Sequence, residues 1–232
     1  MASQPPSEPP VALVDRSIGV LRVVRIASLI IALCAAGLIM YRIYSAPAAT
    51  TGSANSLEEF PEHGTLIEPP KPLSDFTLTS QDGKPLSLSD LHGKYVLLFF
   101  GYTHCPDVCP TTLSDFLQVK RQIGAASSEV RFVFVSVDGE RDTPPVLARF
   151  VKNFDPGFIG LQGDDATLGR IGAEYGLYYK KEKVAGTSQP YSVTHSSSSY
   201  LLDRAGRMRM IYGFGVAPQV IATDIGTLLA SD

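Results

Sequence analysis

Two cysteines lie four positions apart in the segment GYTHCPDVCP, which covers residues 101–110. On a helix, this spacing places the two Cα atoms about 6 Å apart, inside the window of roughly 4.4–6.8 Å that a disulfide requires. The same spacing lets both thiolates reach one metal ion, and soft sulfur ligands favour Cu(I) or zinc over hard cations. Cys105 and Cys109 are therefore predicted to form a redox-active disulfide, a metal site, or both.

Pro110 limits where the helix after the cysteines can begin. A proline inside a helix lacks the N–H for the hydrogen bond to the carbonyl four residues earlier, and its ring clashes with that carbonyl. We therefore predict that the regular helix begins near Pro110, with residues 105–109 in an irregular turn ahead of it. Both thiols then lie near a helix N-terminus, whose partial positive charge favours the thiolate form.

The elements that must position these cysteines alternate between strands and helices. Residues 95–100 and 130–137 are continuous apolar runs, which is typical of strands covered on both faces. The predicted strands are 76–79, 85–88, 95–100, 130–137, 177–180, 198–203 and 208–212, and the predicted helices are 111–123, 143–154, 165–175 and 217–229. This order is that of a thioredoxin-like α/β fold, a mixed central sheet flanked by helices. The cysteines follow strand 95–100, at the strand end where ligand sites collect in α/β sheets.

An apolar segment lies near the N-terminus. Residues 26–41 contain no charge and are bracketed by Arg25 and Arg42. Apolar residues on either side extend the segment toward the ~20 residues that a transmembrane helix needs. We predict a transmembrane anchor over residues 23–44, inserted in the lipid bilayer, in which Cys34 is only an apolar filler.

The anchor divides the chain into four predicted parts. Residues 1–22 form a disordered, Pro-rich cytoplasmic tail, and residues 45–56 form a flexible linker of small residues. Residues 57–232 form the folded domain. The arginines ahead of the anchor place the N-terminus in the cytoplasm by the positive-inside rule, so the domain lies outside it. A cleaved signal peptide, with residues 46–48 as its cleavage box, is the alternative.

Composition and charge restrict the class of protein further. The chain is 44% hydrophobic and 19% charged, which indicates a globular domain, and three cysteines are too few for a disulfide-stapled scaffold. The formal net charge is −3 with no basic stripe, so we expect no nucleic-acid partner. The acidic residues Glu8 and Asp15 are unlike a mitochondrial transit peptide. We therefore expect a single-pass bacterial inner-membrane protein with its domain in the periplasm; the alternative is the mitochondrial inner membrane, facing the intermembrane space.

Three motifs together resemble one known family. They are GYTHCPDVCPTTL from residue 101, VSVDGERDTP from residue 135 and VTHSSSSYLLDRAG from residue 193. In this order, over about residues 65–232, they closely resemble the Sco/SenC family of membrane-anchored, thioredoxin-like copper-binding proteins that assist assembly of the copper site of cytochrome c oxidase. The resemblance implies that Cys105, Cys109 and His195 bind copper.

The chemistry of these side chains agrees with that implication. Cu(I) accepts a soft three-coordinate site, for which two thiolates and one imidazole suffice. Cu(II) requires a further ligand such as water or a nearby carboxylate. His195 precedes the predicted strand 198–203, in a loop that faces the strand–helix turn in thioredoxin-like folds. His104 ranks lower as a ligand, because adjacent side chains usually point apart.

Three of the four charged residues in a loop of the second motif have expected roles. Asp138 and Arg141 are expected to form a salt bridge, and Asp142 is expected to cap helix 143–154. The alternative role of these residues is to shape the copper loop or a partner surface.

Two principal functions remain open. The first is a copper chaperone, not an enzyme, that receives copper from an upstream periplasmic donor and passes it to a cytochrome c oxidase subunit. The second is a thiol-disulfide oxidoreductase that keeps the cysteines of the oxidase copper site reduced. A peroxide-reducing or copper-sensing relative is a more distant third. The chaperone needs His195, whereas the reductase needs only the two cysteines.

Overall fold

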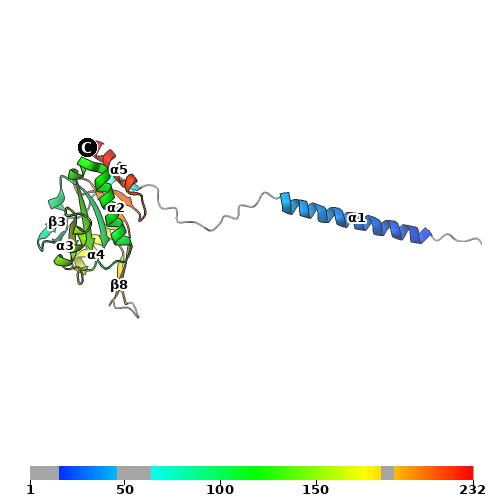
Figure 1. Cartoon of the computed structure of the whole chain (residues 1–232), viewed down its shortest axis with the longest axis horizontal. Coiled ribbons are helices and arrows are strands. Elements are labelled where there is room, and N and C mark those ends of the chain that lie inside the picture. Colours follow the sequence, from blue (N-terminus) through cyan, green and yellow to red (C-terminus); the bar gives the residue numbers. More distant parts are fainter. Residues whose placement is uncertain (1–15, 46–63, 184–190, 232) are drawn as a thin grey trace, which may run out of the picture. The chain divides into compact units, whose positions relative to one another are not determined.

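The computed structural model describes residues 16–45, 64–183 and 191–231 (Figure 1). The chain divides into two compact units, residues 1–57 and 58–232. Most of the predicted linker 45–56 and residues 1–15 of the predicted tail lie outside the described residues.

In its described residues, 16–45, the first unit is the helix α1 (Arg16–Ser45). The helix begins earlier than the predicted anchor, so residues 16–22 are helical, whereas we expected them to belong to a disordered tail. In the described part of the chain, no helix is both long enough and apolar enough to cross a membrane, so the anchor predicted for residues 23–44 is not confirmed.

The second unit is built on an eight-stranded sheet in the order β1-β10-β9-β4-β5-β6-β2-β3. Its central strand β4 pairs in parallel with β5 and antiparallel with β9, so the sheet is mixed, as predicted. Every residue of β4 is buried, which explains its uninterrupted apolar sequence. The strands are β1 (Thr65–Lys71), β2 (Thr77–Ser80), β3 (Pro85–Ser87), β4 (Tyr95–Gly101), β5 (Val130–Ser136), β6 (Ile159–Gln162), β9 (Ser199–Leu202) and β10 (Met208–Tyr212).

Helices cover both faces of this sheet. Phe100 of β4 contacts Tyr175 of α4 (Asp165–Tyr175). Phe132 of β5 lies in register with Leu97, on the opposite face from Phe100, and contacts Phe116 of α2 (Val108–Ile123). The predicted thioredoxin-like α/β fold is therefore confirmed. The other α-helices in the described residues of this unit are α3 (Pro144–Lys152), which packs on β6, and α5 (Pro218–Ser231), which packs beside α2 (Figure 1).

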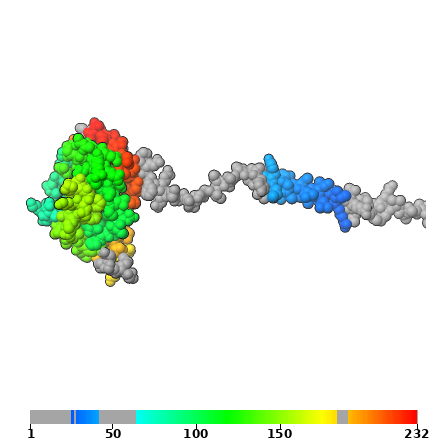
Figure 2. All heavy atoms as spheres, viewed as in Figure 1, coloured from blue at the N-terminus to red at the C-terminus, as the bar shows by residue number. Residues whose placement is uncertain are grey.

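The surface seen from the same side shows the pairing of α2 with α5. In Figure 2, the red atoms of α5 lie at the surface together with green atoms of the segment that includes α2. The domain also contains two short 3₁₀ helices in its described residues, η1 (Ser89–Leu91) and η2 (Gly124–Glu129).

Three strands were not predicted from the sequence. β1 contains two prolines, and it forms an edge of the sheet, where a strand tolerates proline. β6 is short and contains Gly160. β8 (Ser192–His195) pairs with β7 (Tyr179–Glu182) in a separate two-stranded sheet. This β7–β8 hairpin matters for function because His195 is its last strand residue.

Candidate metal centre

The segment between β4 and α2 positions both cysteines. The helix begins at Val108, two residues before Pro110, so the prediction that Cys109 precedes the helix was wrong. Pro110 is tolerated because the first four N–H groups of a helix have no partner within the helix. The first helical hydrogen bond runs from the N–H of Thr111 to the carbonyl of Asp107, at 3.1 Å. Cys109 therefore lies in the first turn, where its side chain is fully buried, and Cys105 lies outside the helix, half-buried.

His195 completes a compact cluster with the two cysteines. The nearest ligand atoms of Cys105, Cys109 and His195 all lie within 4.8 Å of one another. The Nε2 atom of His195 is 3.5 Å from the Sγ atom of Cys109. The three residues predicted as ligands are thus brought together, and in this structure both thiols are free rather than joined in a disulfide.

A hydrogen bond fixes which nitrogen of His195 faces the cysteines. The Nδ1 atom lies 2.8 Å from the carbonyl oxygen of Ser196. A carbonyl can only accept, so Nδ1 must carry the hydrogen and donate it. In the neutral ring, the lone pair is then on Nε2, which faces Cys109. Metal-binding histidines are commonly oriented by such a bond from the second ring nitrogen.

Cys105 and Cys109 have pKa values shifted in opposite directions, so that Cys105 loses its proton first. The pKa of Cys105 is lowered to about 4, first because the Cys109 thiol donates a hydrogen bond to its sulfur, with a smaller contribution from His195. The N–H of Cys109 also donates to the Cys105 sulfur, at 3.4 Å. The pKa of Cys109 is raised, first by the Cys105 thiolate and then by burial. At neutral pH, the cluster therefore presents one thiolate and one thiol, and a metal ion that binds both sulfurs must displace the Cys109 proton.

Aromatic rings and one glycine shape the walls of the cluster. The rings of Phe99 and Tyr102 both meet the His195 ring edge to face, with centroids 5.8 Å away. A Cβ atom at Gly101 would lie 2.7 Å from the Sγ atom of Cys109, closer than real Cβ atoms come. The absence of a side chain at Gly101 therefore makes room for the buried sulfur. The sequence motif contains Gly101, but nothing in its spacing indicated this role.

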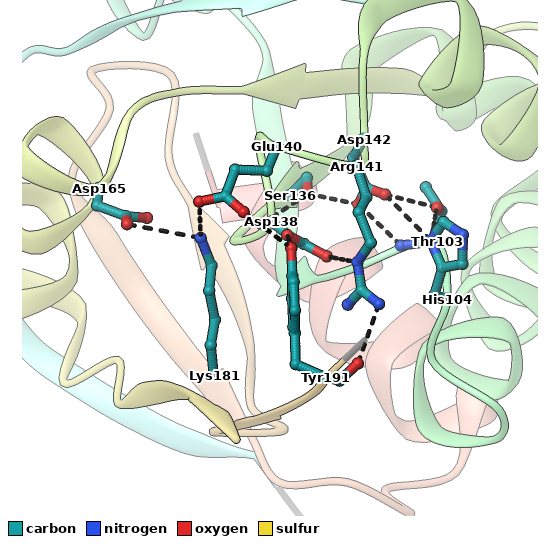
Figure 3. A network of polar contacts seen from close by, with 10 residues as sticks. All are labelled: Thr103, His104, Ser136, Asp138, Glu140, Arg141, Asp142, Asp165, Lys181 and Tyr191. Atoms are coloured by element: carbon teal, nitrogen blue, oxygen red, sulfur yellow. Dashed lines mark hydrogen bonds and ion pairs between the residues drawn. The ribbon is translucent and has the colours of Figure 1, made fainter. Parts of the chain in front are cut away.

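The loop of residues 138–142 contacts the cysteine segment through Thr103 (Figure 3). The carboxylate of Asp142 is fully buried and accepts hydrogen bonds from the N–H and the hydroxyl of Thr103, at 2.8 and 2.6 Å. The prediction that Asp142 caps the next helix was wrong: Thr143 occupies the N-cap position of α3. The prolines in the first turn of α3 lack the N–H groups that a cap would satisfy.

The other predictions about this region agree with the structure. Arg141 forms the expected ion pair with Asp138. His104 lies beside Asp142, with 3.7 Å between its Nδ1 atom and the carboxylate, and it is not a member of the cysteine cluster.

Comparisons with known proteins identify relatives of this chain. A model of the SCO1/SenC family matches residues 65–230. The mitochondrial SCO2 homolog of Mus musculus is 35% identical over 159 residues, which cover 68% of this chain and 62% of that protein. A SCO2-like protein of Rickettsia prowazekii is 35% identical over 132 residues, which cover 57% of this chain and 64% of that protein. The match therefore spans less than two thirds of the length of either relative.

Solved structures of Sco proteins are also similar to this chain. The structure of Bradyrhizobium japonicum ScoI with copper bound is 39% identical, with a TM-score of 0.60 over 66% of this chain and 97% of that chain. The solution structures of apo Sco1 from Thermus thermophilus are 36% identical, with a TM-score of 0.64 over 73% of this chain and 98% of that chain. With the family model matching nearly the whole folded domain, the chain belongs to the SCO1/SenC family.

Proposed function

We propose that this protein carries one copper ion on Cys105, Cys109 and His195 and delivers it to the copper centre of cytochrome c oxidase. The observation that supports this proposal most strongly is the geometry of the cluster, in which one ligand atom of Cys105, of Cys109 and of His195 all lie within 4.8 Å of one another. Two soft sulfurs and one imidazole satisfy three-coordinate Cu(I), and Cu(II) would need a further ligand. The copper in the structure of Bradyrhizobium japonicum ScoI supports the choice of metal.

The unequal burial of the two sulfurs suits a carrier. Cys109 is fully buried, whereas Cys105 is half-buried and reaches the surface. A ligand of the receiving protein can therefore approach Cu(I) on the side of Cys105. Transfer then proceeds by ligand exchange and needs no bond-breaking chemistry, so the protein acts as a carrier rather than an enzyme. Loading requires reduced cysteines, because a disulfide offers no thiolate.

The proposal includes a place of action. The domain works in the periplasm, tethered to the bacterial inner membrane through residues 23–44, and receives copper from an upstream donor. The arginines ahead of this segment support that orientation. The mitochondrial inner membrane is the alternative, and the mitochondrial relative in Mus musculus supports keeping it.

A second candidate function rests on the lowered pKa of Cys105. Its thiolate would attack a disulfide of the oxidase subunit, forming a mixed disulfide and releasing one client thiolate. Cys109 would lose its proton and attack the Cys105 sulfur, which releases the second client thiolate. Two electrons pass to the client, and Cys105 and Cys109 end as a disulfide. This reaction requires both cysteines but not His195.

An experiment in a cell that lacks the gene for this protein distinguishes copper delivery from thiol reduction. Cys105→Ser and His195→Ala variants are returned to the cell, and the assembled oxidase copper centre is measured by its absorption spectrum. Copper delivery predicts that both variants fail, although the His195→Ala protein still cycles between dithiol and disulfide. Oxidase assembly that survives His195→Ala but fails with Cys105→Ser would refute delivery and favour the reductase.

A further inference from the structure

His195 is held apart from the main sheet. It ends β8, and in the described part of the chain β8 pairs with β7 alone, at the register Tyr179–His195. The backbone hydrogen bonds that tie β4 into the eight-stranded sheet therefore do not fix the imidazole. Its distance from the cysteines depends on the contacts that attach the β7–β8 hairpin to the body of the domain, together with the short link from His195 to β9 and the ring contacts with Phe99 and Tyr102.

Tyr191, directly before β8, makes one of these attachments, to the loop of residues 138–142 (Figure 3). Its hydroxyl donates to the carboxylate of Asp138 at 2.6 Å and lies 3.2 Å from the carboxylate of Glu140. The guanidinium of Arg141 lies 3.9 Å from the centre of the Tyr191 ring and donates to the Tyr191 carbonyl oxygen at 3.0 Å. Both the ring and the backbone at this position are thus held by one short loop.

The partners of Tyr191 are themselves held firmly. The side chain of Asp138 is fully buried and ion-paired with Arg141, whose own side chain is only 14% exposed. The N–H of Asp138 donates to the Ser136 hydroxyl at the end of β5. Without Arg141, the buried carboxylate of Asp138 would be left with uncompensated charge, so this ion pair resists change.

The same loop also holds the cysteine segment. Four residues after Asp138, the carboxylate of Asp142 accepts two hydrogen bonds from Thr103, two residues before Cys105. Residues 138–142 therefore contact the cysteine segment at one end and the hairpin of His195 at the other. Lys181 of β7 adds a contact to this loop through Glu140, at 3.2 Å.

We propose that Tyr191, clasped by Asp138 and Arg141, is a positioning residue that sets the distance between the His195 imidazole and the two cysteine sulfurs. This inference rests on the proposed function, since it assigns a role toward a copper ion. Its physical content concerns the position of the imidazole, which exists without copper. Tyr191 is assigned this role through its hydrogen bonds with Asp138, Glu140 and Arg141 rather than as a ligand.

The first test needs no metal. Tyr191→Phe removes the hydroxyl and keeps the ring that stacks on Arg141, so the domain is expected to fold. Tyr179→Phe is the matched control, because it also removes a tyrosine hydroxyl from this hairpin. The Tyr179 hydroxyl makes only a long hydrogen bond, at 3.4 Å, to the carbonyl oxygen of Asp165. The proton NMR signal of the His195 ring, assigned with His195→Ala, reports the shielding by Phe99 and Tyr102. We expect it to move toward the value of a free histidine in Tyr191→Phe only. An unmoved signal in Tyr191→Phe, or an equal movement in both variants, would overturn the proposal.

The second test measures Cu(I) affinity in a double-mutant cycle. Cu(I) is titrated into four forms of the full chain, all of which contain Cys34→Ser. One has no further change, one contains Tyr191→Phe, one contains His195→Ala, and one contains both. Loss of a residue that orients a ligand lowers metal affinity by about 10- to 100-fold, so Tyr191→Phe alone is expected to lower it about tenfold. In the His195→Ala background, Tyr191→Phe should change it less than about twofold, because the imidazole it positions is gone. Arg141→Lys, which keeps the charge but loses the planar guanidinium, should follow the same pattern.

The outcomes separate the two proposals. An equal loss in both backgrounds would mean that Tyr191 acts through the cysteines or through general stability, which would overturn its positioning role. If the unsubstituted chain binds Cu(I) without any dependence on His195, the proposed function fails. The metal-free NMR comparison then still decides whether Tyr191 holds the imidazole in place.

Discussion

The Nε2 atom of His195 lies 3.5 Å from the Sγ atom of Cys109, although 86 positions separate the two residues in the chain. One is in the first turn of α2 and the other ends a hairpin outside the main sheet. The cluster therefore exists only in the folded domain, and its quality as a metal site depends on groups that hold these two elements in place.

Gly101→Ala should disturb the buried sulfur. The new Cβ would lie 2.7 Å from the Sγ atom of Cys109, 2.8 Å from Phe134 and 2.9 Å from Phe99. Overpacking of this kind costs about 1–3 kcal/mol in the free energy of unfolding. We expect a lower melting temperature and weaker Cu(I) binding, measured by thermal unfolding and chelator competition. The control is Gly226→Ala in α5, where nothing lies within 4 Å. It should be neutral or add about 0.5–1 kcal/mol of stability, and equal effects of the two substitutions would contradict the packing argument.

Asp142→Asn should loosen the cysteine segment. The carboxylate accepts hydrogen bonds from the N–H and hydroxyl of Thr103 and from the hydroxyl of Ser136. An amide would turn an NH₂ group toward some of these donors and leave them unsatisfied, at a cost of about 1–3 kcal/mol. Urea unfolding measures this loss.

The matched control for that substitution is Asp164→Asn. Asp164 caps α4 by accepting from the N–H of Thr167 at 2.8 Å, a role that asparagine fills equally well. Its effect should stay below about 0.5 kcal/mol, as for surface changes in general. If Asp142→Asn were as mild as Asp164→Asn, the supporting role of the buried carboxylate would be refuted.

The alkylation rate of Cys105 should depend much less on pH than that of an ordinary thiol. With its pKa lowered to about 4, Cys105 is already a thiolate at neutral pH, so its alkylation rate should hardly change between about pH 6 and about pH 9. An ordinary thiol, with a pKa of about 8.5, gains nearly tenfold in rate per pH unit below that value. The measurement uses iodoacetamide with the metal-free Cys34→Ser chain. Cys109→Ala removes the main hydrogen-bond donor to Cys105, so it should restore the ordinary rise. A steep rise in the unsubstituted site would show that the thiolate is not stabilised.

Local sequence patterns predicted the central part of the fold well. The buried strand β4 and the helix α4 were predicted almost residue for residue, because a continuous apolar run and a helix ended by Gly176 are local signals. The strands β6 and β8 were missed because both are short and lack a strong apolar pattern. Their formation depends on partners far along the chain.

The sequence likewise predicted some residues of the candidate site and missed others. The cysteine pair is visible from its spacing and the family motif, and His195 from the motif alone. The roles of Gly101 and Tyr191 were not predicted, because one depends on a missing side chain packed against a sulfur and the other on a contact with a loop some 50 positions earlier. The helix start at Val108 was placed two residues late, since proline is excluded from the interior of a helix but not from its first turn.

The most direct test of the proposed copper site is an anaerobic Cu(I) titration of the reduced Cys34→Ser chain against a competing chelator. It compares the unsubstituted site with His195→Ala and with His104→Ala, a control that removes the histidine beside Cys105 whose ring faces Asp142. We predict one tightly bound copper per chain, unchanged in His104→Ala and weakened in His195→Ala by more than the ~100-fold that loss of a supporting residue costs. Weak binding, or equal affinity in the unsubstituted and His195→Ala proteins, would contradict a site made of Cys105, Cys109 and His195.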